Sequence, residues 1–523
     1  MLKSRDELIA QLGTTNKWDI VIIGGGATGL GAALDAAARG YKTLLVEQAD
    51  FAKGTSSKAT KLVHGGVRYM AQGDIALVRE ACHERGLLLK NAPHLTKNES
   101  FVIPNYSLFN NIKYTIGLKF YDLLAGKLSL GKSKYINKAK TIAALPAIKP
   151  KGLKGGVVYH DGQFDDARLA LNIAQTAIEN GACVLNYMQV TSLIKENGKV
   201  SGIKFKDAET GKYYEAKGSI VINATGVYVD NILQMDNPQS RHTVRPSQGT
   251  HIVIDQSFLP GGQALMIPKT DDGRVLFGVP WHGKLVVGTT DSLREHPELE
   301  PRALEDEINF ILHTAGNYLV RKPSRKDILA VFVGLRPLAA PKNENESTKE
   351  ISRSHKITIT TSNLVTITGG KWTTYRKMAE DVVNKAIETG QLPAQKCVTE
   401  TLKIHGYSLE NKLDEHGITG FYGADLKEIE SLYLTDTDLS HRIVDGYPFT
   451  KGMAVWAARN EYALRVEDVL ARRFRLLFLD VNAAIQAAPV VATLLAKELE
   501  KDNAWIEKEI ADVLSLAEIY RVK

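Results

Sequence analysis

The strongest hydrophobic pattern in the chain is a strand–helix–strand unit close to the N-terminus. Residues 20–23 form a short apolar run with the length and β-branched content of a buried parallel strand. A helix of small residues follows, and a second apolar run covers residues 43–46 and stops at Glu47. The pattern therefore predicts a βαβ unit with buried strands.

The turn between the first strand and the helix has three glycines, Gly24, Gly26 and Gly29, in G-x-G-x-x-G spacing. In such a turn, Gly24 permits the tight bend, Gly26 lets the backbone approach a pyrophosphate, and Gly29 lets the helix pack against the strand. The helix N-terminus offers N–H groups to phosphates, and Glu47 can accept hydrogen bonds from an adenosine ribose. We interpret the unit as a dinucleotide site; an ordinary βαβ turn is the alternative.

Periodicity further along the chain predicts a mixed core and a helical tail. Helical spacing covers residues 74–90 and starts again at Asp165 or Asp166. Short alternating strands between 246 and 338 are typical of an antiparallel sheet. Residues 364–386 again predict strand, glycine turn and helix, and long helical periodicities then follow.

Composition places the chain among globular proteins of more than one domain. It has 523 residues, 44% apolar and 24% charged. No apolar run reaches the length of a spanning helix, and three widely spaced cysteines without a CxxC pair argue against a disulfide framework or a metal site. The charged N-terminus is not expected to be a secretory signal. Ser4 and Glu7 instead have capping-box spacing, and Gly13 is expected to end that helix.

The net charge of +7 is unevenly distributed. Residues 396–523 hold 16 Lys and Arg against 21 Asp and Glu, so the excess of positive charge lies earlier in the chain. Residues 101–140 contain seven lysines and one acidic residue, Asp122. This basic stretch predicts an anionic partner, either a membrane surface or a phosphorylated substrate, and it has no recognised nucleic-acid-binding motif.

Eight motifs occur in a fixed order along most of the chain. They are GGGATG followed by VE, TSSKATKLVHGGVRYM, FDDARL, NATGVYVD, GTTD, GLRPL and GGKWTTYRK. In this order the chain resembles the FAD-dependent glycerol-3-phosphate dehydrogenases of the D-amino-acid-oxidase-like flavoproteins over roughly residues 15–390. The later RVEDVLARRFRLLFLD is similar to the helical domain that this family appends.

The resemblance implies an α/β fold with a Rossmann-like FAD-binding domain, an antiparallel substrate-cap sheet and a C-terminal helical domain. The expected divisions are an N-terminal capped helix at 1–17, the oxidoreductase domain at 18–393 and the helical domain at 394–523. Within the oxidoreductase domain, FAD-binding segments are expected at about 18–100, 155–235 and 355–393, and cap segments at about 101–154 and 236–354.

The implied reaction is oxidation of sn-glycerol 3-phosphate to dihydroxyacetone phosphate, with hydride transfer to FAD and electrons passed to a quinone. The alternatives are a glycerol-3-phosphate oxidase that uses oxygen, or another flavoprotein of the superfamily. The expected location is cytoplasmic, at the inner face of the cell membrane, and homodimerisation is left open.

Glycine turns recur at Gly226 and Gly370, far from the first turn, and a long ligand such as extended FAD fits contact with all of them. Hydroxyls and backbone donors at Thr55, Ser56 and Ser57 suit a pyrophosphate. The resemblance extends the expected FAD contacts to a larger set: Gly24, Gly26, Ala27, Thr28, Gly29, Glu47, Thr55, Ser56, Ser57, Lys61, Leu62, Val190, Ala224, Gly226, Gly370, Lys371, Thr373 and Thr374. Val190 is included because the family holds the adenine with backbone groups at such a strand start; an ordinary strand valine is the alternative.

The segment from His64 to Tyr69 combines two glycines with several side chains that could take part in catalysis or substrate binding. Its two glycines would let the backbone lie against the flavin ring, with His64 and Arg68 facing the substrate. The pKa range of histidine suits removal of a proton from an alcohol, although a structural histidine is the alternative.

A phosphate needs cations, and arginine supplies a planar fork. Arg68, Tyr69, Arg336 and Lys371 are therefore the expected substrate contacts, with His64, Arg336 and Lys371 as the catalytic set. Lys371 could equally sit by the flavin pyrimidine.

Two charged segments remain. Asp165 and Asp166 suit a helix N-cap and first turn, and the alternating charges of residues 465–475 predict a solvated helix face. Residues 110–135 interleave lysines, among them Lys113, Lys119 and Lys127, with apolar side chains. That pattern predicts an in-plane membrane contact, with a helix packed on its own domain as the alternative.

Overall fold

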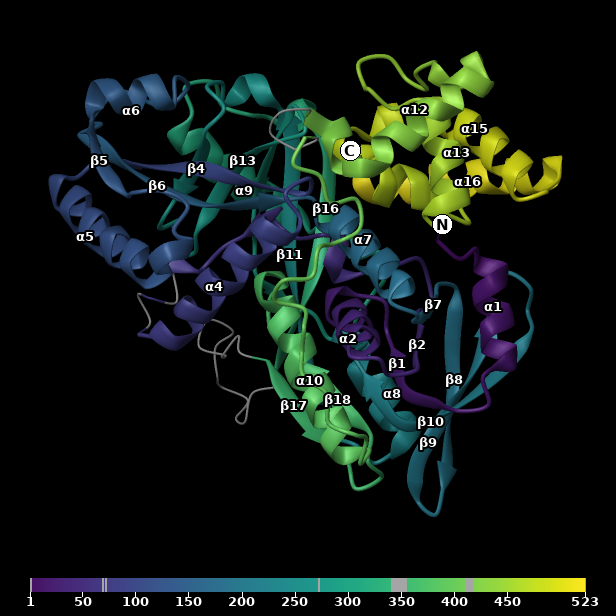
Figure 1. The fold of residues 1–523 in the computed structure, drawn as a ribbon. Coiled ribbons are helices and arrows are strands. Elements are labelled where there is room, and N and C mark those ends of the chain that lie inside the picture. Colours follow the sequence, from purple (N-terminus) through teal and green to yellow (C-terminus); the bar gives the residue numbers. More distant parts are fainter. Residues whose placement is uncertain are drawn as a thin grey trace.

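The protein contains two β-sheets and a group of helices formed by the C-terminal residues (Figure 1). The computed structural model describes residues 2–67, 70, 73–270, 273–339, 355–410 and 417–522. The mixed α/β architecture that the sequence predicts, with a helical C-terminal region, is confirmed.

The first sheet has a parallel core. Strands β18, β10, β1, β2 and β7 pair in parallel in this order, and β17 adds to the edge in the antiparallel sense. Strands β8 and β9 form an antiparallel extension from β10. The bounds are β1 Trp18–Ile23, β2 Thr43–Val46, β7 Cys183–Leu185, β8 Met188–Glu196, β9 Lys199–Asp207, β10 Tyr213–Asn223, β17 Lys356–Ile359 and β18 Val365–Thr368.

Helix α2 (Ala27–Ala38) packs between α7 (Asp166–Glu179) and α10 (Tyr375–Thr389). The close packing of α2 on α10 requires small residues on α2, because a Cβ on Gly31 would come within 2.9 Å of the Tyr375 ring. The βαβ unit predicted from residues 20–47 is confirmed, as is the start of a helix at Asp165 or Asp166. Two further helices are α1 (Arg5–Thr14) and α8 (Val229–Asp236).

The second sheet is larger and mostly antiparallel, with one parallel pairing between β12 and β4. Strand β6 pairs with β4 along its whole length, so this sheet takes in residues 155–164 as well as the predicted cap segments. Its strands are β3 Leu62–Val63, β4 Thr96–Asn105, β5 Lys134–Asn137, β6 Gly155–Phe164, β11 Val244–Asp255, β12 Ala264–Ile267, β13 Leu276–Trp281, β14 Lys284–Gly288, β15 Ser292–Leu293 and β16 Ile328–Ala339.

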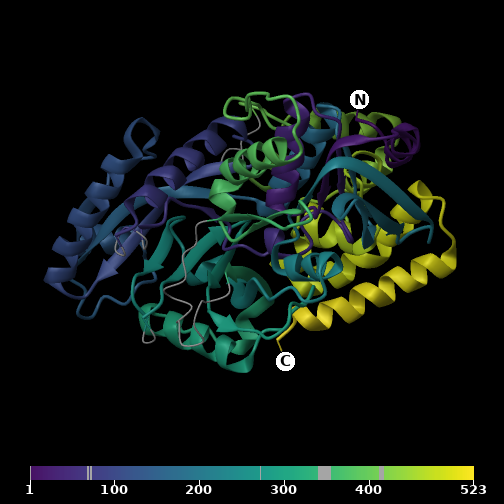
Figure 2. The ribbon, with the colours of Figure 1, turned by 90° about the horizontal axis from the view of Figure 1, so that it is seen from below.

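Four helices accompany the second sheet: α4 (Ile75–Asn91), α5 (Leu108–Ala125), α6 (Lys138–Ala144) and α9 (Glu305–Tyr318). Asp74 caps α4 by accepting from Leu77 N, and the helix predicted at 74–90 is confirmed. Helix α5 lies at the outer edge of the molecule, opposite the C-terminal helices (Figures 1 and 2).

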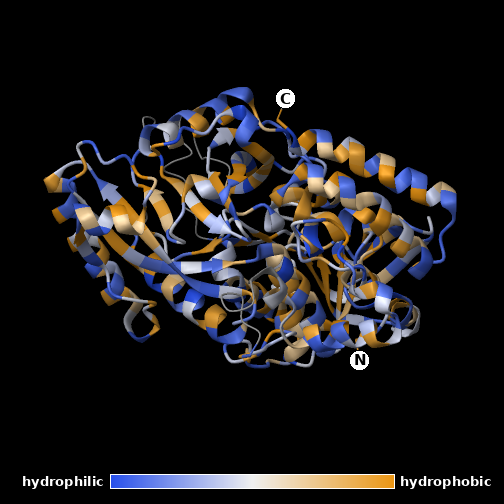
Figure 3. Cartoon of the chain, turned by 90° about the horizontal axis from the view of Figure 1, so that it is seen from above, coloured by the Kyte–Doolittle hydropathy of each residue, from blue (hydrophilic) through white to orange (hydrophobic). Residues whose placement is uncertain are grey.

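The C-terminal helices pack against β16, and their π-helical segment packs against α7. They are α12 Leu426–Thr435, α13 Lys451–Asn460, a π-helical segment Asp468–Arg473, α14 Leu476–Leu479, α15 Val481–Glu498 and α16 Asn503–Tyr520. Helix α16 runs along the outside and ends beside the second sheet (Figure 2), where Tyr520 donates to Glu300 over 2.7 Å. Its alternation of polar and apolar residues (Figure 3) fits that outer position.

Two local predictions need correction. The capping box of Ser4 and Glu7 is confirmed, but α1 continues through Gly13 to Thr14 because backbone hydrogen bonds extend past the glycine. The predicted solvated face at 465–475 is wrong: Asp468, Arg472 and Arg473 are buried. They are buried because each finds an opposite charge, as when Arg472 Nε donates to Asp50 over 2.5 Å.

Candidate FAD and substrate site

The N-terminus of α2 forms a glycine-lined cradle. Gly24 has a φ of +110°, and a Cβ there would lie 2.7 Å from the carbonyl oxygen of Ala224. A Cβ on Gly29 would overlap the carbonyl oxygen of Gly24, so Gly29 lets strand and helix approach. A Cβ on Gly26 would meet Ser56 Oγ at 3.2 Å. The absence of side chains at these positions lets the backbone at the helix N-terminus come close to a ligand, which suits a pyrophosphate.

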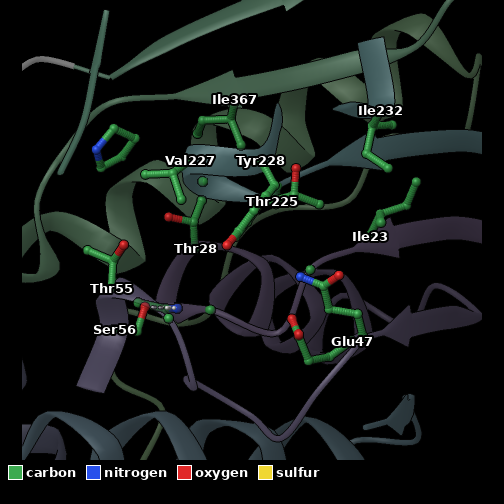
Figure 4. Close-up of a pocket in the computed structure, with 18 of the residues that line it drawn as sticks. Ile23, Thr28, Glu47, Thr55, Ser56, Thr225, Val227, Tyr228, Ile232 and Ile367 are labelled. Atoms are coloured by element: carbon green, nitrogen blue, oxygen red, sulfur yellow. Dashed lines mark hydrogen bonds between the residues drawn. The ribbon is translucent and has the colours of Figure 1, made fainter. Parts of the chain in front are cut away.

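The Thr55–Ser57 turn lies next to the N-terminus of α2 and forms another wall of the cradle (Figure 4). Ser56 Oγ accepts from Ala27 N over 2.9 Å, and Trp372 Nε1 donates to the Ser56 carbonyl oxygen over 2.8 Å. Thr55 Oγ1 donates to Leu335 O over 2.6 Å. This turn is thus fixed to β16 and to the segment that precedes α10.

Glu47 stands at the end of β2, where its carboxylate accepts from Gly25 N (2.6 Å) and Ala49 N (3.0 Å). Burial raises the pKa of Glu47 to about 7, although these backbone hydrogen bonds act to lower it. The side chain still lines the cavity (Figure 4), so the predicted ribose contact remains sterically open.

A cavity of about 260 Å³ lies at the cradle. Predicted FAD contacts from six separate segments line it: Gly24, Gly26, Ala27, Thr28, Glu47, Thr55, Ser56, Val190, Ala224, Gly226, Gly370 and Lys371. The glycine cradle and the convergence of these distant segments fit a dinucleotide bound in extended form.

Six predicted FAD contacts lie outside the lining of that cavity: Gly29, Ser57, Lys61, Leu62, Thr373 and Thr374. Leu62 and Thr373 line the neighbouring one, and Thr374 Oγ1 donates to Lys371 O over 3.3 Å. The ammonium of Lys61 is fully buried behind the Thr55–Ser57 turn, where it donates to Asp166 and to Ser57 O over 2.8 Å. Burial lowers the pKa of Lys61 to about 7. Ser57 and Lys61 therefore support the site from behind.

A second cavity of about 290 Å³ adjoins the first and shares Thr55, Pro337, Gly370, Lys371 and Trp372 with it. The predicted catalytic residues His64, Arg336 and Lys371 all line this cavity. Arg68 and Tyr69 lie outside the described residues, so their placement in the site stays a prediction.

Arg336 is held in the cavity wall by β11 and by the segment after β14. Its Nη2 donates to Thr289 Oγ1 (3.1 Å) and Thr290 O (3.0 Å), and Nη1 lies 3.5 Å from Asp291 Oδ1. The side chain is 23% exposed. The guanidinium is thus oriented by neutral acceptors and by the Asp291 carboxylate, and it keeps access to the cavity.

The turn that holds His64 is tied down from two sides. His64 N donates to Thr373 Oγ1 over 3.1 Å, and Gly65 N donates to Tyr121 Oη over 2.9 Å. Asp161, which lines the same cavity, accepts from Arg85 Nη1 (2.6 Å) and Tyr121 Oη (2.9 Å).

Sequence reasoning missed Asp161 and His251, both buried and both in the cavity wall. Asp161 belongs to a strand with no motif, and His251 was placed only within an alternating strand pattern. His251 Nε2 contacts Thr60 Oγ1 at 2.9 Å, and burial, reinforced by Arg336 and Lys61, lowers the pKa of His251 well below its usual range.

Comparison with known proteins agrees with this geometry. Residues 19–375 match the family of FAD-dependent oxidoreductases, and residues 360–506 match the C-terminal domain of alpha-glycerophosphate oxidase. The mitochondrial glycerol-3-phosphate dehydrogenase of Bos taurus is 39% identical over 97% of this chain and 74% of its own length. The mitochondrial SDP6 enzyme of Arabidopsis thaliana is 38% identical over 96% and 86%.

A solved structure gives the same result. The glycerol-3-phosphate dehydrogenase of Bacillus halodurans, complexed with FAD, superposes with a TM-score of 0.80 at 29% identity, covering 99% of this chain and 98% of its own. The chain therefore belongs to the FAD-dependent oxidoreductases, in the branch that holds the glycerol-3-phosphate dehydrogenases, and FAD is its cofactor.

Proposed function

We propose that this chain oxidises sn-glycerol 3-phosphate to dihydroxyacetone phosphate and passes the electrons to a quinone. The observation that carries the proposal is the cavity that joins the FAD cradle: Arg336, Lys371 and His64 meet there from three distant segments. The relatives named glycerol-3-phosphate dehydrogenase support the same substrate.

Arg336 is the proposed phosphate ligand. Its guanidinium is planar, is held by Thr289 and Thr290, and keeps part of its surface toward the cavity. A planar fork binds two phosphate oxygens together, which a single ammonium cannot do. Lys371, shared by both cavities, adds a positive charge between phosphate and cofactor. Unphosphorylated polyols would offer these two cations no phosphate to bind.

His64 is the proposed base. Its backbone is fixed to Thr373, and its ring lines the substrate cavity. A neutral imidazole there can take the proton of the C2 hydroxyl while hydride leaves C2. FAD, when bound, supplies the two-electron acceptor for that hydride. The protein's own part is to orient C2, to hold the proton and to exclude water.

The electron acceptor is proposed to be a quinone. The experiment is to reduce the enzyme anaerobically with glycerol 3-phosphate and to mix it in a stopped-flow instrument with oxygen or with a soluble quinone analogue. Fast reoxidation by the quinone and slow reoxidation by oxygen is the expected result. Fast reoxidation by oxygen alone would instead identify an oxidase.

A lipid-soluble acceptor requires contact with a membrane, and α5 is the proposed contact, at the inner face of the cell membrane. Within the described residues no helix has the length and apolarity to cross a bilayer. Helix α5 instead exposes an apolar face, which we call the α5 apolar face; its members are Leu108, Phe109, Ile112, Ile116, Phe120 and Leu123. Lysines 113 and 119 on this helix are also exposed. Exposed apolar and basic side chains on one outer helix suit an in-plane lipid contact.

A further inference from the structure

A cluster of buried charges joins the C-terminal helical region to the back of the FAD cradle. Its members, which we call the junction cluster, are Lys61, Asp165, Asp166, His282 and Arg475, and the side chains of all five are at most 4% exposed. Burying a charge is costly unless it is paired and hydrogen-bonded. Such a cluster therefore needs every partner in place.

Arg475 is the only member from the C-terminal helical region. Its Nη2 donates to Asp166 Oδ1 (2.7 Å) and to the carbonyl oxygen of Ser57 (2.9 Å). Its Nη1 donates to Ala471 O over 2.6 Å, which anchors the side chain in its own region. The guanidinium also lies over the rings of Phe478 and Trp281, at 4.5 and 5.4 Å from their centroids. One side chain thus reaches from the helical region into the oxidoreductase core.

The contact with Ser57 is the important one, because Ser57 belongs to the Thr55–Ser57 turn. Ser56 in that turn binds the N-terminal amide of α2 through Ala27, and Thr55 and Ser56 line the FAD cavity. The Ser57 carbonyl oxygen accepts from both Lys61 and Arg475. Lys61 itself needs Asp166, which Arg475 also holds.

We propose that Arg475 is a positioning residue for FAD, and that the C-terminal helical region serves to hold the Thr55–Ser57 turn in its cofactor-binding position. Removal of the guanidinium frees one side of the Ser57 carbonyl and leaves Lys61 as the remaining charged partner of Asp166 among the described contacts. The turn then moves relative to the α2 N-terminus, and the pyrophosphate loses part of its enclosure. This role is independent of which substrate the enzyme oxidises.

The same interface offers a matched control. Arg168 and Glu461 form another fully buried ion pair, 2.7 Å apart, between α7 and the C-terminal region. Neither side chain has a hydrogen bond to the Thr55–Ser57 turn among the described contacts, and neither lines the FAD cavity. Glu461→Gln therefore weakens the interface without touching the turn.

The test compares FAD affinity with stability in Arg475→Met, Arg475→Lys and Glu461→Gln. Each protein is stripped of FAD, titrated with FAD by fluorescence, and melted with and without the cofactor. We expect Arg475→Met to raise the FAD dissociation constant at least tenfold and to shrink the rise in Tm that FAD produces. Glu461→Gln should lower both melting temperatures equally and leave the dissociation constant within twofold.

Arg475→Lys keeps the positive charge but loses the planar fork of the guanidinium. This variant should fold and should release FAD at least threefold faster than the wild type. It also serves as the test if Arg475→Met fails to fold. Wild-type FAD affinity in the folded arginine variants would overturn the proposal. An equal loss of affinity in Glu461→Gln would also overturn it, because any loosening of the interface would then suffice.

Discussion

At the scale of single residues, the site depends on positions that must stay small and on charges that must stay oriented. Gly24 and Gly29 have no room for a Cβ because backbone atoms occupy the space. A Cβ on Gly26 would make a tight contact with Ser56 Oγ, at 3.2 Å, and Gly26 also lines the cavity proposed for the pyrophosphate. Arg336 can bind a phosphate because Thr289, Thr290 and Asp291 orient its guanidinium and leave it accessible.

Gly26→Val should abolish FAD binding while the chain still folds. The valine methyl groups would fill the space between the α2 N-terminus and the Thr55–Ser57 turn, where a Cβ alone already comes to 3.2 Å of Ser56 Oγ. The measurement is the flavin-to-protein ratio after purification. Gly13→Val is the control, because nothing lies within 4 Å of a Cβ there. A folded Gly26→Val protein with stoichiometric FAD would refute the assignment of the cradle.

Arg336→Lys should raise KM for glycerol 3-phosphate far more than it lowers FAD content, since the charge stays and the fork is lost. Arg336→Ala should lose at least tenfold in kcat/KM, because truncating a buried charged contact costs roughly 2–5 kcal/mol. Arg325→Lys, on an exposed arginine paired with Glu305, is the control. Steady-state kinetics with unchanged KM in both Arg336 variants would show that the phosphate binds elsewhere.

At the scale of elements, α5 has two different faces. Its buried side presents Tyr121, which binds Gly65 N and Asp161 at the substrate cavity. Its other side carries the α5 apolar face, with the largest exposures at Leu123 (73%) and Phe109 (71%). The helix therefore packs on its own domain, as the alternative reading expected, and still leaves an amphipathic surface outward.

The triple substitution of Lys113, Lys119 and Lys127 by glutamate should release the protein from vesicles that contain anionic lipid. Each lysine near such a surface contributes about 1 kcal/mol. Activity with a soluble dye acceptor should persist, because none of the three lines either cavity. The control is the same change at Lys497, Lys501 and Lys508, on α15, between α15 and α16, and on α16. Equal vesicle binding by the two triple variants would show that α5 is not the contact.

At the scale of the whole molecule, short sequence motifs predicted the features that depend on neighbouring residues in the chain. The β1–α2–β2 unit, the glycine turns and the convergence of His64, Arg336 and Lys371 all follow from short motifs. The junction cluster did not: Arg475 and Asp166 are 309 residues apart, and the charges of residues 465–475 suggest a solvated face until their partners are known. Buried charge pairs of this kind carry no periodic signal in the sequence.

The central claim is that the enzyme oxidises a phosphorylated polyol bound in the cavity next to FAD. Anaerobic reduction of the bound flavin tests this claim most directly. The holoenzyme is mixed with sn-glycerol 3-phosphate, glycerol, or a hydroxy acid, and bleaching of the flavin absorbance is followed. We predict full bleaching by glycerol 3-phosphate and at least tenfold slower reduction by glycerol at the same concentration, because glycerol has no phosphate for Arg336 and Lys371 to bind. Equal reduction by glycerol and its phosphate would contradict the account.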